Sequence, residues 1–241
     1  MKLSIIICVY NEKDSILPVL ERVHQAPLRP GWEREVIVLD NASTDGTQDL
    51  LLNISYNDTQ VVFQPRNMGK GTSIRTAIPL CTGDYAFIQD ADFEYDPNDY
   101  PLFLERAEVN HPAAIFGSRT LGGRAIYKYA ANYWGVRFLT GITNLLYGGH
   151  LTDVATASKM VRTDILKRLK LVGSSFDLDF ELADKLLRAG YEIVEIPIHY
   201  TPRTIEEGKK IRPKDGLDAL RVILRDRLSP MSKVIDTRSA G

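Results

Sequence analysis

Short apolar runs alternate with helical patterns through the first half of the chain. Residues 3–9 are apolar apart from one serine, as a parallel strand buried on both faces requires. Further β-rich runs follow at residues 35–39, 61–64 and 84–89, and a helical pattern spans about residues 72–81. Between the first two runs, apolar residues recur at helical spacing: Ile16, Leu17, Val19, Leu20 and Val23. This alternation predicts an α/β fold with a mainly parallel sheet and helices on both faces.

The second half of the chain is less regular. We expect three more strands and three more helices, at residues 115–118, 159–162 and 192–200 and at residues 125–147, 179–189 and 215–228, respectively. Gly141 offers a point at which the longest helix could break. Residues 203–214 are interpreted as a polar, basic loop, and residues 229–241 as a frayed tail.

Polar side chains follow four of the expected strands. These clusters are Tyr10-Asn11-Glu12, Asp40-Asn41, Arg66-Asn67 and Asp90-Ala91-Asp92. In open parallel sheets, ligands bind beyond the carboxyl ends of the strands. The four clusters are therefore expected to meet along one edge of the sheet and to form a ligand site there.

The sharpest chemical motif is the acidic one. Asp90 and Asp92 follow a strand that we expect to be buried, and Glu94 lies two residues further on. Carboxylates at alternate positions of an extended turn can face the same way, which suits a hard divalent cation that bridges two phosphates. Such a cation would act as a Lewis acid on a leaving diphosphate. Acidic residues are also common in solvated turns, so the motif alone leaves both interpretations open.

Other candidates have a binding and a structural interpretation. Asp40 could accept hydrogen bonds from a base or a ribose, or it could cap the next helix. The turn at residues 67–71 permits close backbone approach and its Lys70 could meet negative charge, although it is not a Walker A loop. Arg119 follows a strand end and could bind phosphate, as could a late basic cluster that comprises Arg203, Lys209, Lys210, Arg212 and Lys214. A run of charges is also commonly just a solvated face.

Composition narrows the class of protein. Hydrophobic residues make up 44% of the 241 and charged residues 25%, which is typical of a globular domain. The 30 Lys and Arg nearly balance the 31 Asp and Glu, so we expect no nucleic-acid partner. Cys8 and Cys81 cannot build a disulfide framework, and as small buried residues they fit a reducing cytosol. No run of about 18 apolar residues occurs, so we expect a cytoplasmic protein that contacts a membrane only from its surface.

Taken together, the motifs resemble a known family. The first half is similar to the nucleotide-sugar domain of family 2 inverting glycosyltransferases in SIIICVYNE, EVIVLDNASTDGT, NMGKG, GDYAFIQDADFEYDP and FGSR. The second half resembles the dolichyl- or polyprenyl-phosphate sugar transferases in LTDVATASKMVR, FDLDFELADKLLRAGYEIVEIPIHYTPRTIEEGKKI and RPKDGLDAL. The resemblance covers residues 3–228.

The resemblance implies a fold and an activity. The fold is a single GT-A (Rossmann-like) domain, with the nucleotide-sugar half at residues 1–118 and the acceptor half at residues 119–228. The activity is an inverting, metal-dependent transfer of a hexose from GDP-mannose or UDP-glucose to a polyprenyl or dolichyl phosphate. The implied cofactor is Mg²⁺ or Mn²⁺, and the protein would lie in the cytoplasm or peripherally on the cytoplasmic membrane face.

Residue roles are also implied by the resemblance. The donor would be bound by Cys8, Tyr10, Glu12, Asp40, Asn67, Lys70, Asp90 and Ala91. The metal would be held by Asp90, Asp92 and Glu94, the last at a position where relatives often carry Gln. The acceptor and the phosphates would be contacted by Arg119, Asp153, Arg203 and Lys209, with residues 176–181 near the acceptor. The catalytic residues would be Asp92, Asp179 and Glu181.

Two departures from the family pattern bear on the acceptor. Relatives usually have a Gly- or Cys-bearing aromatic stretch where this chain has residues 155–158, so the sugar contacts there stay open. Many of the lipid-phosphate transferases also carry C-terminal membrane helices, whereas this sequence has no such segment.

The identity of the acceptor decides whether a base is needed. A hydroxyl acceptor must lose a proton, and Asp177, Asp179 or Glu181 could take it, although helical periodicity places one of the three away from the others. A phosphate monoester is already anionic and needs orientation rather than a base. The abundance of Arg and Lys in the second half favours the phosphate, with a cytosolic transferase acting on a saccharide or small-molecule hydroxyl as the alternative.

Two other classes of protein fit the sequence less well than a transferase. A nucleotidyltransferase would need a nucleotide-fingerprint loop near the start of the chain, and residues 8–12 are not Gly-rich. A non-catalytic sugar-nucleotide binding module is disfavoured because the acid cluster is intact. Finally, residues 127–147 combine aromatic and basic side chains, which fits either a membrane-interface helix or a core-facing helix under the sheet.

Overall fold

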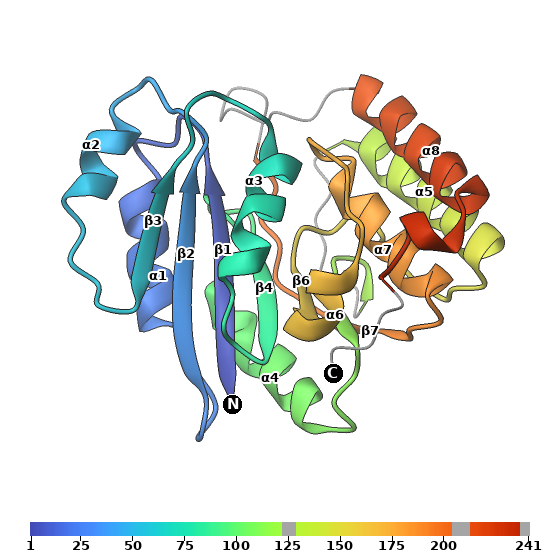
Figure 1. Ribbon diagram of the computed structural model, residues 1–241, viewed down its shortest axis with the longest axis horizontal. Coiled ribbons are helices and arrows are strands. Elements are labelled where there is room, and N and C mark those ends of the chain that lie inside the picture. Colours follow the sequence, from blue (N-terminus) through green and yellow to red (C-terminus); the bar gives the residue numbers. More distant parts are fainter. Residues whose placement is uncertain (122–128, 204–212, 237–241) are drawn as a thin grey trace.

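The computed structural model describes residues 1–121, 129–203 and 213–236 (Figure 1). These residues form a seven-stranded sheet in the spatial order β3-β2-β1-β4-β6-β5-β7. The strands are β1 (Lys2–Val9), β2 (Glu33–Asp40), β3 (Thr59–Phe63), β4 (Tyr85–Asp90), β5 (Ala114–Ser118), β6 (Lys159–Arg162) and β7 (Ile193–Pro197). All neighbouring pairs are parallel except those made by β6, which runs antiparallel to both β4 and β5.

Helices cover both faces of this sheet (Figure 1). They are α1 (Ile16–Gln25), α2 (Thr47–Leu52), α3 (Lys70–Ala77), α4 (Tyr100–Glu108), α5 (Ala130–Tyr147), α6 (Thr163–Arg168), α7 (Leu178–Arg188) and α8 (Pro213–Leu228). Short 3₁₀ turns lie at η1 (Ile78–Leu80), η2 (Pro97–Asp99) and η4 (Met231–Lys233). None of the helices in the described part of the chain combines the length and the apolarity needed to cross a membrane.

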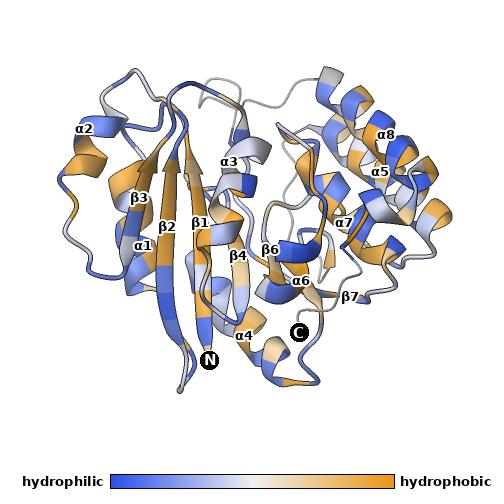
Figure 2. Cartoon of the chain, in the orientation of Figure 1, coloured by the Kyte–Doolittle hydropathy of each residue, from blue (hydrophilic) through white to orange (hydrophobic). Residues whose placement is uncertain are grey.

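Alternation along the central strands divides the core into two layers. Ile5 and Ile7 of β1 face the layer built with α1, α2 and α4, whereas Ile6 faces the layer built with α3, α5, α6, α7 and α8. This period of two follows from the pleat, which sends successive side chains to opposite faces. Figure 2 shows the resulting apolar strands at the centre, with polar positions toward their ends. The expected α/β fold with a mainly parallel sheet is confirmed.

Several elements differ from the sequence-based expectations. Helix α4 was not anticipated, although Tyr100, Phe103, Leu104 and Ala107 stand at helical spacing and are buried. Helix α5 begins at Ala130 and continues through Gly141, so the longest helix has no break there. The reversal of β6 was not anticipated either, because hydrophobic pattern carries no information on strand direction.

The C-terminal segment also differs from expectation. We expected a frayed tail from residue 229, but Val234 and Ile235 are buried and Ile235 forms a β-bridge with Leu169. Burial of these two apolar side chains accounts for this docking. Residues 237–241 lie outside the described part of the chain, as does most of the basic loop expected at residues 203–214.

The two halves of the chain meet at two glycines. Gly69 has φ +85°, and a Cβ at this position would overlap the carbonyl oxygen of Ser174. A Cβ at Gly71 would lie 2.7 Å from the carbonyl oxygen of Gly173. Only glycine therefore lets the start of α3 approach the segment that leads into α7 so closely. This contact brings Lys70 and Asp179 to one cavity.

Candidate active site

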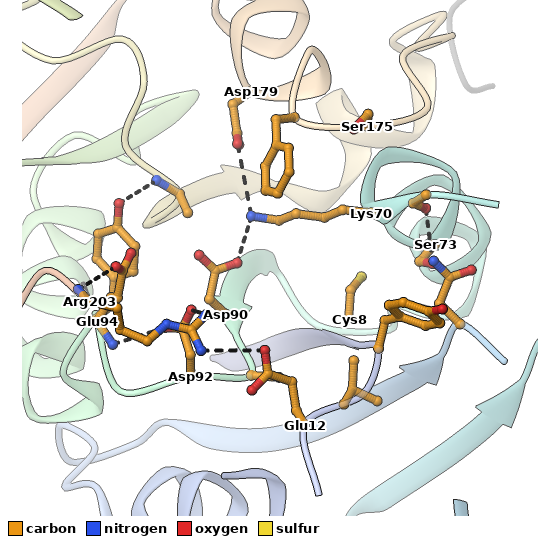
Figure 3. Close-up of a pocket in the computed structure, with 18 of the residues that line it drawn as sticks. Cys8, Glu12, Lys70, Ser73, Asp90, Asp92, Glu94, Ser175, Asp179 and Arg203 are labelled. Atoms are coloured by element: carbon orange, nitrogen blue, oxygen red, sulfur yellow. Dashed lines mark hydrogen bonds and ion pairs between the residues drawn. The ribbon is translucent and has the colours of Figure 1, made fainter. Parts of the chain in front are cut away.

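A cavity of about 250 Å³ opens at the carboxyl ends of β1 and β4, where the strand-end clusters were expected to converge (Figure 3). Both halves of the chain line it. The first half contributes Cys8, Val9, Tyr10, Glu12, Asn41, Asn67, Gly69, Lys70, Ser73, Asp90, Ala91, Asp92, Glu94 and Tyr95. The second half contributes Arg119, Ala155, Ala157, Ser175, Phe176, Asp179, Tyr200 and Arg203.

Lys70 lies across the cavity between two carboxylates (Figure 3). Its ammonium nitrogen is 2.6 Å from Oδ1 of Asp90 and 3.9 Å from Oδ2 of Asp179. Burial opposes the charge on Lys70, but the two carboxylates outweigh it and raise the lysine pKa above its usual range. Lys70 is therefore a fixed cation at the centre of the cavity.

Arg203 follows β7 and contacts three acidic side chains that line the cavity. Its guanidinium is 2.5 Å from Oδ2 of Asp92 and 3.5 Å from Oε1 of Glu12, and its backbone N–H donates to Oε1 of Glu94 at 2.7 Å. The Nε of Arg203 is buried and has no acceptor among the described residues. Burial opposes the charge of Arg203, but Asp92, Glu12 and Glu94 together raise its pKa.

The carboxyl of Asp92 is buried beside other charged groups. Burial, followed by the charge of Asp90, raises the pKa of Asp92 to about 7, while Arg203 acts in the opposite direction. An additional cation placed beside Asp92 would favour its ionised form and lower its pKa.

Arg119 follows β5 and is held by Asp153. Two of its side-chain nitrogens donate to the two Asp153 oxygens at 2.7 Å each, and its backbone N–H donates to the same carboxylate at 3.0 Å. Burial of Asp153 is outweighed by Arg119, so the pKa of Asp153 is lowered. The guanidinium also lies 5.0 Å from the ring centre of Tyr200, whose hydroxyl donates to Glu94 at 3.2 Å. Asp153 thus fixes the orientation of the Arg119 side chain, which also lines the cavity.

Two asparagines shape the wall at the ends of β2 and β3. The Asn41 amide donates to Oδ1 of Asn67 at 2.9 Å, and its own Oδ1 accepts from the Met68 backbone N–H at 2.8 Å. These bonds fix the turn that ends at Gly69 and starts α3. Nearby, burial raises the pKa of the Cys8 thiol to about 12, so this cysteine is a neutral wall residue.

Most of the residues predicted for the site do line the cavity. Twelve do so: Cys8, Tyr10, Glu12, Asn67, Lys70, Asp90, Ala91, Asp92, Glu94, Arg119, Asp179 and Arg203. Four do not, namely Asp40, Asp153, Asp177 and Glu181. Lys209 lies outside the described residues.

Glu181 is corrected from a candidate base to a structural residue. It is fully buried, and its carboxylate accepts from the backbone N–H groups of Val172 and Gly173. It also pairs with Lys185 at 2.8 Å and with Arg225 at 3.0 Å. Its carboxylate is thus occupied away from the cavity, because residues two positions apart on a helix, such as Asp179 and Glu181, point in different directions.

Asp40 and Asp177 have local roles as well. Asp40 is fully buried, and its Oδ2 accepts from the Ser43 backbone N–H at 3.1 Å and from the Gln48 amide at 2.6 Å, which fixes the loop after β2. Asp177 accepts from the Ser175 backbone N–H at 2.7 Å and lies on a different surface depression. Of the three acids considered as bases, the structure therefore brings only Asp179 to the cavity.

The donor set fits a divalent cation in part. Among the described residues, no three His, Cys, Asp or Glu side chains form a ready-made cage. Glu94 does not fit a metal ligand, because its carboxylate is committed to the Arg203 backbone and to Tyr200. Asp90 and Asp92 do fit, since Mg²⁺-type ions are commonly held by one or two carboxylates, with substrate phosphates and water completing the shell.

Sequence reasoning missed Tyr95, Tyr200 and Ser73. Tyr95 and Tyr200 form a β-bridge at the cavity wall, and the Tyr95 hydroxyl accepts from the Ala157 backbone N–H at 3.1 Å. Tyr200 could have been found, because it follows β7 and the strand-end rule applies to every parallel strand. Ser73, in the first turn of α3, carried no comparable signal.

Comparison with known proteins identifies the class. A family model described as glycosyl transferase family 2 matches residues 4–170. The chain belongs to this family, and the resemblance inferred from its motifs is confirmed.

The relatives are more specific. The chain is 27% identical over 179 residues to a dodecaprenyl-phosphate galacturonate synthase of Rhizobium johnstonii; the match covers 72% of this chain but only 51% of the relative. It is 26% identical over 218 residues to an undecaprenyl-phosphate mannosyltransferase of Micrococcus luteus, covering 87% of each protein. The chain thus spans about half the length of the first relative and most of the second.

Solved structures agree on the fold. A glucosyl-3-phosphoglycerate synthase from Mycobacterium tuberculosis, solved with Mn²⁺, uridine diphosphate and phosphoglyceric acid, superposes with a TM-score of 0.67 at 18% identity. The superposition covers 95% of this chain and 79% of that one. The expected GT-A architecture is therefore confirmed.

Proposed function

We propose that this protein is an inverting, metal-dependent hexosyltransferase that uses a nucleoside-diphosphate sugar, GDP-mannose or UDP-glucose, and a polyprenyl or dolichyl phosphate. One observation carries the proposal. A single cavity holds three cations, Lys70, Arg119 and Arg203, opposite carboxylates that could share a metal ion with a diphosphate. The names of the curated relatives, which are polyprenyl-phosphate glycosyltransferases, support the acceptor class.

The donor is assigned to the first-half wall, residues 1–118. Tyr10, Asn41 and Asn67 would bind the nucleoside, since they line the cavity beyond β1, β2 and β3. Asp90 and Asp92 would hold Mg²⁺ or Mn²⁺, which when bound supplies Lewis-acid stabilisation of the leaving diphosphate. Lys70 would meet the same negative charge from the other side.

The acceptor phosphate is assigned to the second-half wall, residues 119–228. Arg119 and Arg203 face the cavity from the loops after β5 and β7. The Nε of Arg203, which has no acceptor in the part of the chain that the structure describes, offers an anion a buried donor. Because a phosphate monoester already carries a negative oxygen, these arginines need only orient it in line with the breaking bond. No general base is required for this acceptor.

Helices α5 and α8 would place the protein on a membrane surface. They pack together through the Tyr147 hydroxyl, which donates to the Ile223 carbonyl at 2.6 Å, and Figure 2 shows apolar positions along both helices. The exposed apolar side chains are Trp134, Phe138 and Leu145 on α5 and Leu217, Leu224 and Leu228 on α8. Exposed arginines accompany them at 137, 221, 225 and 227, while α5 contains no acidic residue. This combination suits an anionic lipid surface, where the acceptor phosphate would lie.

The test is transfer of radiolabelled hexose from UDP-glucose and GDP-mannose into an organic-extractable polyprenyl phosphate, with and without Mn²⁺. Metal-dependent labelling of the lipid phase with either donor is expected. Hydrolysis of the donor without lipid labelling would argue against the lipid acceptor and leave the metal site standing.

A second candidate rests on Asp179. This carboxylate lines the cavity, so it could take a proton from a saccharide or small-molecule hydroxyl. Transfer to a soluble hydroxyl acceptor that Asp179→Asn abolishes would favour this candidate. For a phosphate acceptor, the same substitution should lower kcat by less than about tenfold.

A further inference from the structure

Lys159 is the first residue of β6, and its side chain is fully buried. Its ammonium group donates to three backbone carbonyls, those of Val154 at 3.1 Å, Thr156 at 2.6 Å and Asp179 at 2.9 Å. It also lies 3.4 Å from Oδ1 of Asp179. Lys159 does not line the cavity, so it cannot contact a substrate there.

Lys159 is the inner end of a chain of alternating charges. Asp179 stands between Lys159 and Lys70, and Lys70 stands between Asp179 and Asp90. The Lys70 nitrogen is 2.6 Å from Asp90 but 3.9 Å from Asp179, so its closer ion pair is with Asp90. Asp179 can tolerate this distance because its other oxygen already faces the Lys159 ammonium.

The same ammonium fixes two walls of the cavity. Its bonds to Val154 and Thr156 hold the segment that presents Ala155 and Ala157. Its bonds to Asp179 hold the first turn of α7. A buried ammonium with four acceptors is costly to desolvate, and burial accordingly lowers the pKa of Lys159. Replacing the lysine alone would leave the three carbonyls and the Asp179 carboxylate without this donor, so Lys159 also supports the fold, and its effect on ligand affinity has to be separated from its effect on stability.

We infer that Lys159 is a positioning residue: it neutralises Asp179 from behind and so leaves Lys70 available to the diphosphate of the donor. The inference rests on the proposed function in taking the anion to be a donor diphosphate. Without Lys159, Asp179 would have Lys70 as its one neighbouring cation among the described residues and would draw it away from Asp90. Anion binding would then weaken although no residue that touches the anion had changed.

The test is a double-mutant cycle on anion affinity. Titration calorimetry with Mn²⁺ and either UDP, GDP or inorganic pyrophosphate is run on wild type, Lys159→Met, Asp179→Asn and the double variant. Lys159→Met is expected to raise the Kd of each bound anion about tenfold. In the Asp179→Asn background the same change should alter Kd by less than about twofold, because the carboxylate that captures Lys70 is gone.

A merely structural lysine would behave differently. Lys185→Met is the matched control, since Lys185 is also a buried lysine, bonded to Glu181 away from the cavity. It should lower Tm while leaving Kd within about twofold of wild type. Equal effects of Lys159→Met in both backgrounds, or an unchanged Kd, would overturn the inference.

Two outcomes keep the inference separate from the proposed function. If the protein binds pyrophosphate but neither UDP nor GDP, the nucleotide donor is rejected. The pyrophosphate Kd values of the four proteins would still measure the coupling between Lys159 and Asp179. If Lys159→Met does not fold, Asp179→Asn alone decides, because it preserves the three carbonyl bonds of Lys159. It should bind pyrophosphate as tightly as wild type or up to about threefold more tightly, and weaker binding would contradict the inference.

Discussion

The guanidinium of Arg203 lies 2.5 Å from the carboxylate of Asp92, although 111 positions separate the two residues in the chain. The pair joins the segment after β7 to the end of β4 across the mouth of the cavity. Arg203 therefore supplies positive charge beside the buried Asp92. A metal ion bound at Asp92 would take over this role and free Arg203 for a phosphate.

Replacing Arg203 by lysine should separate charge from geometry. Lysine keeps the charge but cannot donate from a planar fork to two anions at once, so we expect kcat/KM for hexose transfer to fall about 10- to 100-fold. Arg203→Met, which also removes the charge, should lower kcat/KM further. Steady-state transfer assays check this, and Arg162→Lys, which alters an exposed arginine paired with Asp164, is the control.

Asp92→Asn should remove the metal response. We expect transfer to fall at least about 100-fold and the Mn²⁺ concentration for half-maximal activity to rise, because a neutral amide is a poor ligand for a hard cation. The matched control is Asp164→Asn, an exposed acid on α6. Wild-type Mn²⁺ dependence in Asp92→Asn would contradict the assignment of the metal to this residue.

Glu181→Gln should damage stability rather than chemistry. The substitution leaves Lys185 and Arg225 without their shared carboxylate, and breaking a buried ion pair in this way costs about 3–5 kcal/mol. Urea unfolding measures the loss. Below the transition, transfer per folded molecule should stay within about threefold of wild type, and a large loss of kcat at unchanged stability would restore Glu181 as a catalytic candidate.

Asp184 should make stability depend on pH. It is buried between α7 and α8, its Oδ2 has no partner among the described residues, and burial followed by the charge of Asp226 raises its pKa to about 8. The unfolded carboxyl titrates near pH 4, so between about pH 4 and pH 8 the folded state holds a proton that the unfolded state releases. This contribution to stability is present below about pH 4 and is lost as pH rises toward 8.

The corresponding variant is Asp184→Asn. It should raise the free energy of unfolding by about 1–3 kcal/mol at pH 8 and change it little at pH 4.5, flattening the profile. Urea unfolding across this range provides the measurement, with Asp164→Asn as an exposed control. A wild-type slope in the variant would show that Asp184 is ionised in the folded protein.

The apolar surface of α5 and α8 should bind anionic lipid. Trp134→Ser combined with Leu145→Ser should reduce co-sedimentation with phosphatidylglycerol-containing vesicles by about tenfold or more, because two large exposed side chains leave the interface. Leu52→Ser removes a leucine on α2 that is as exposed as Trp134, at 68%, and should have no effect. Equal loss in both variants would mean that the binding is not specific to α5 and α8.

Pattern in the sequence anticipated the parallel part of the fold well. The apolar runs of β1, β2 and β4 are buried on both faces, and this burial is what makes them legible without a structure. It also located the cavity, because strand ends converge by topology alone. Glu181 was assigned to the candidate bases because local spacing does not show which distant segments contact a side chain. Its partners Val172 and Arg225 come from outside α7 and occupy its carboxylate away from the cavity. The pairing of Arg203 with Asp92 was out of reach for the same reason.

The reversal of β6 has a consequence for how the chain is assembled. The chain leaves the sheet at Ser118 and re-enters it at Lys159 on the same edge, with Phe116 and Lys159 in register. Residues 119–158 are thus an excursion from one edge that requires no crossover connection. The described part of this excursion contains Arg119, Asp153 and the whole of α5, and α5 packs against α7 and α8 outside it. Under the proposed function, sequence changes confined to this excursion would alter the acceptor contacts and the membrane-facing helix without altering the strands of the donor half.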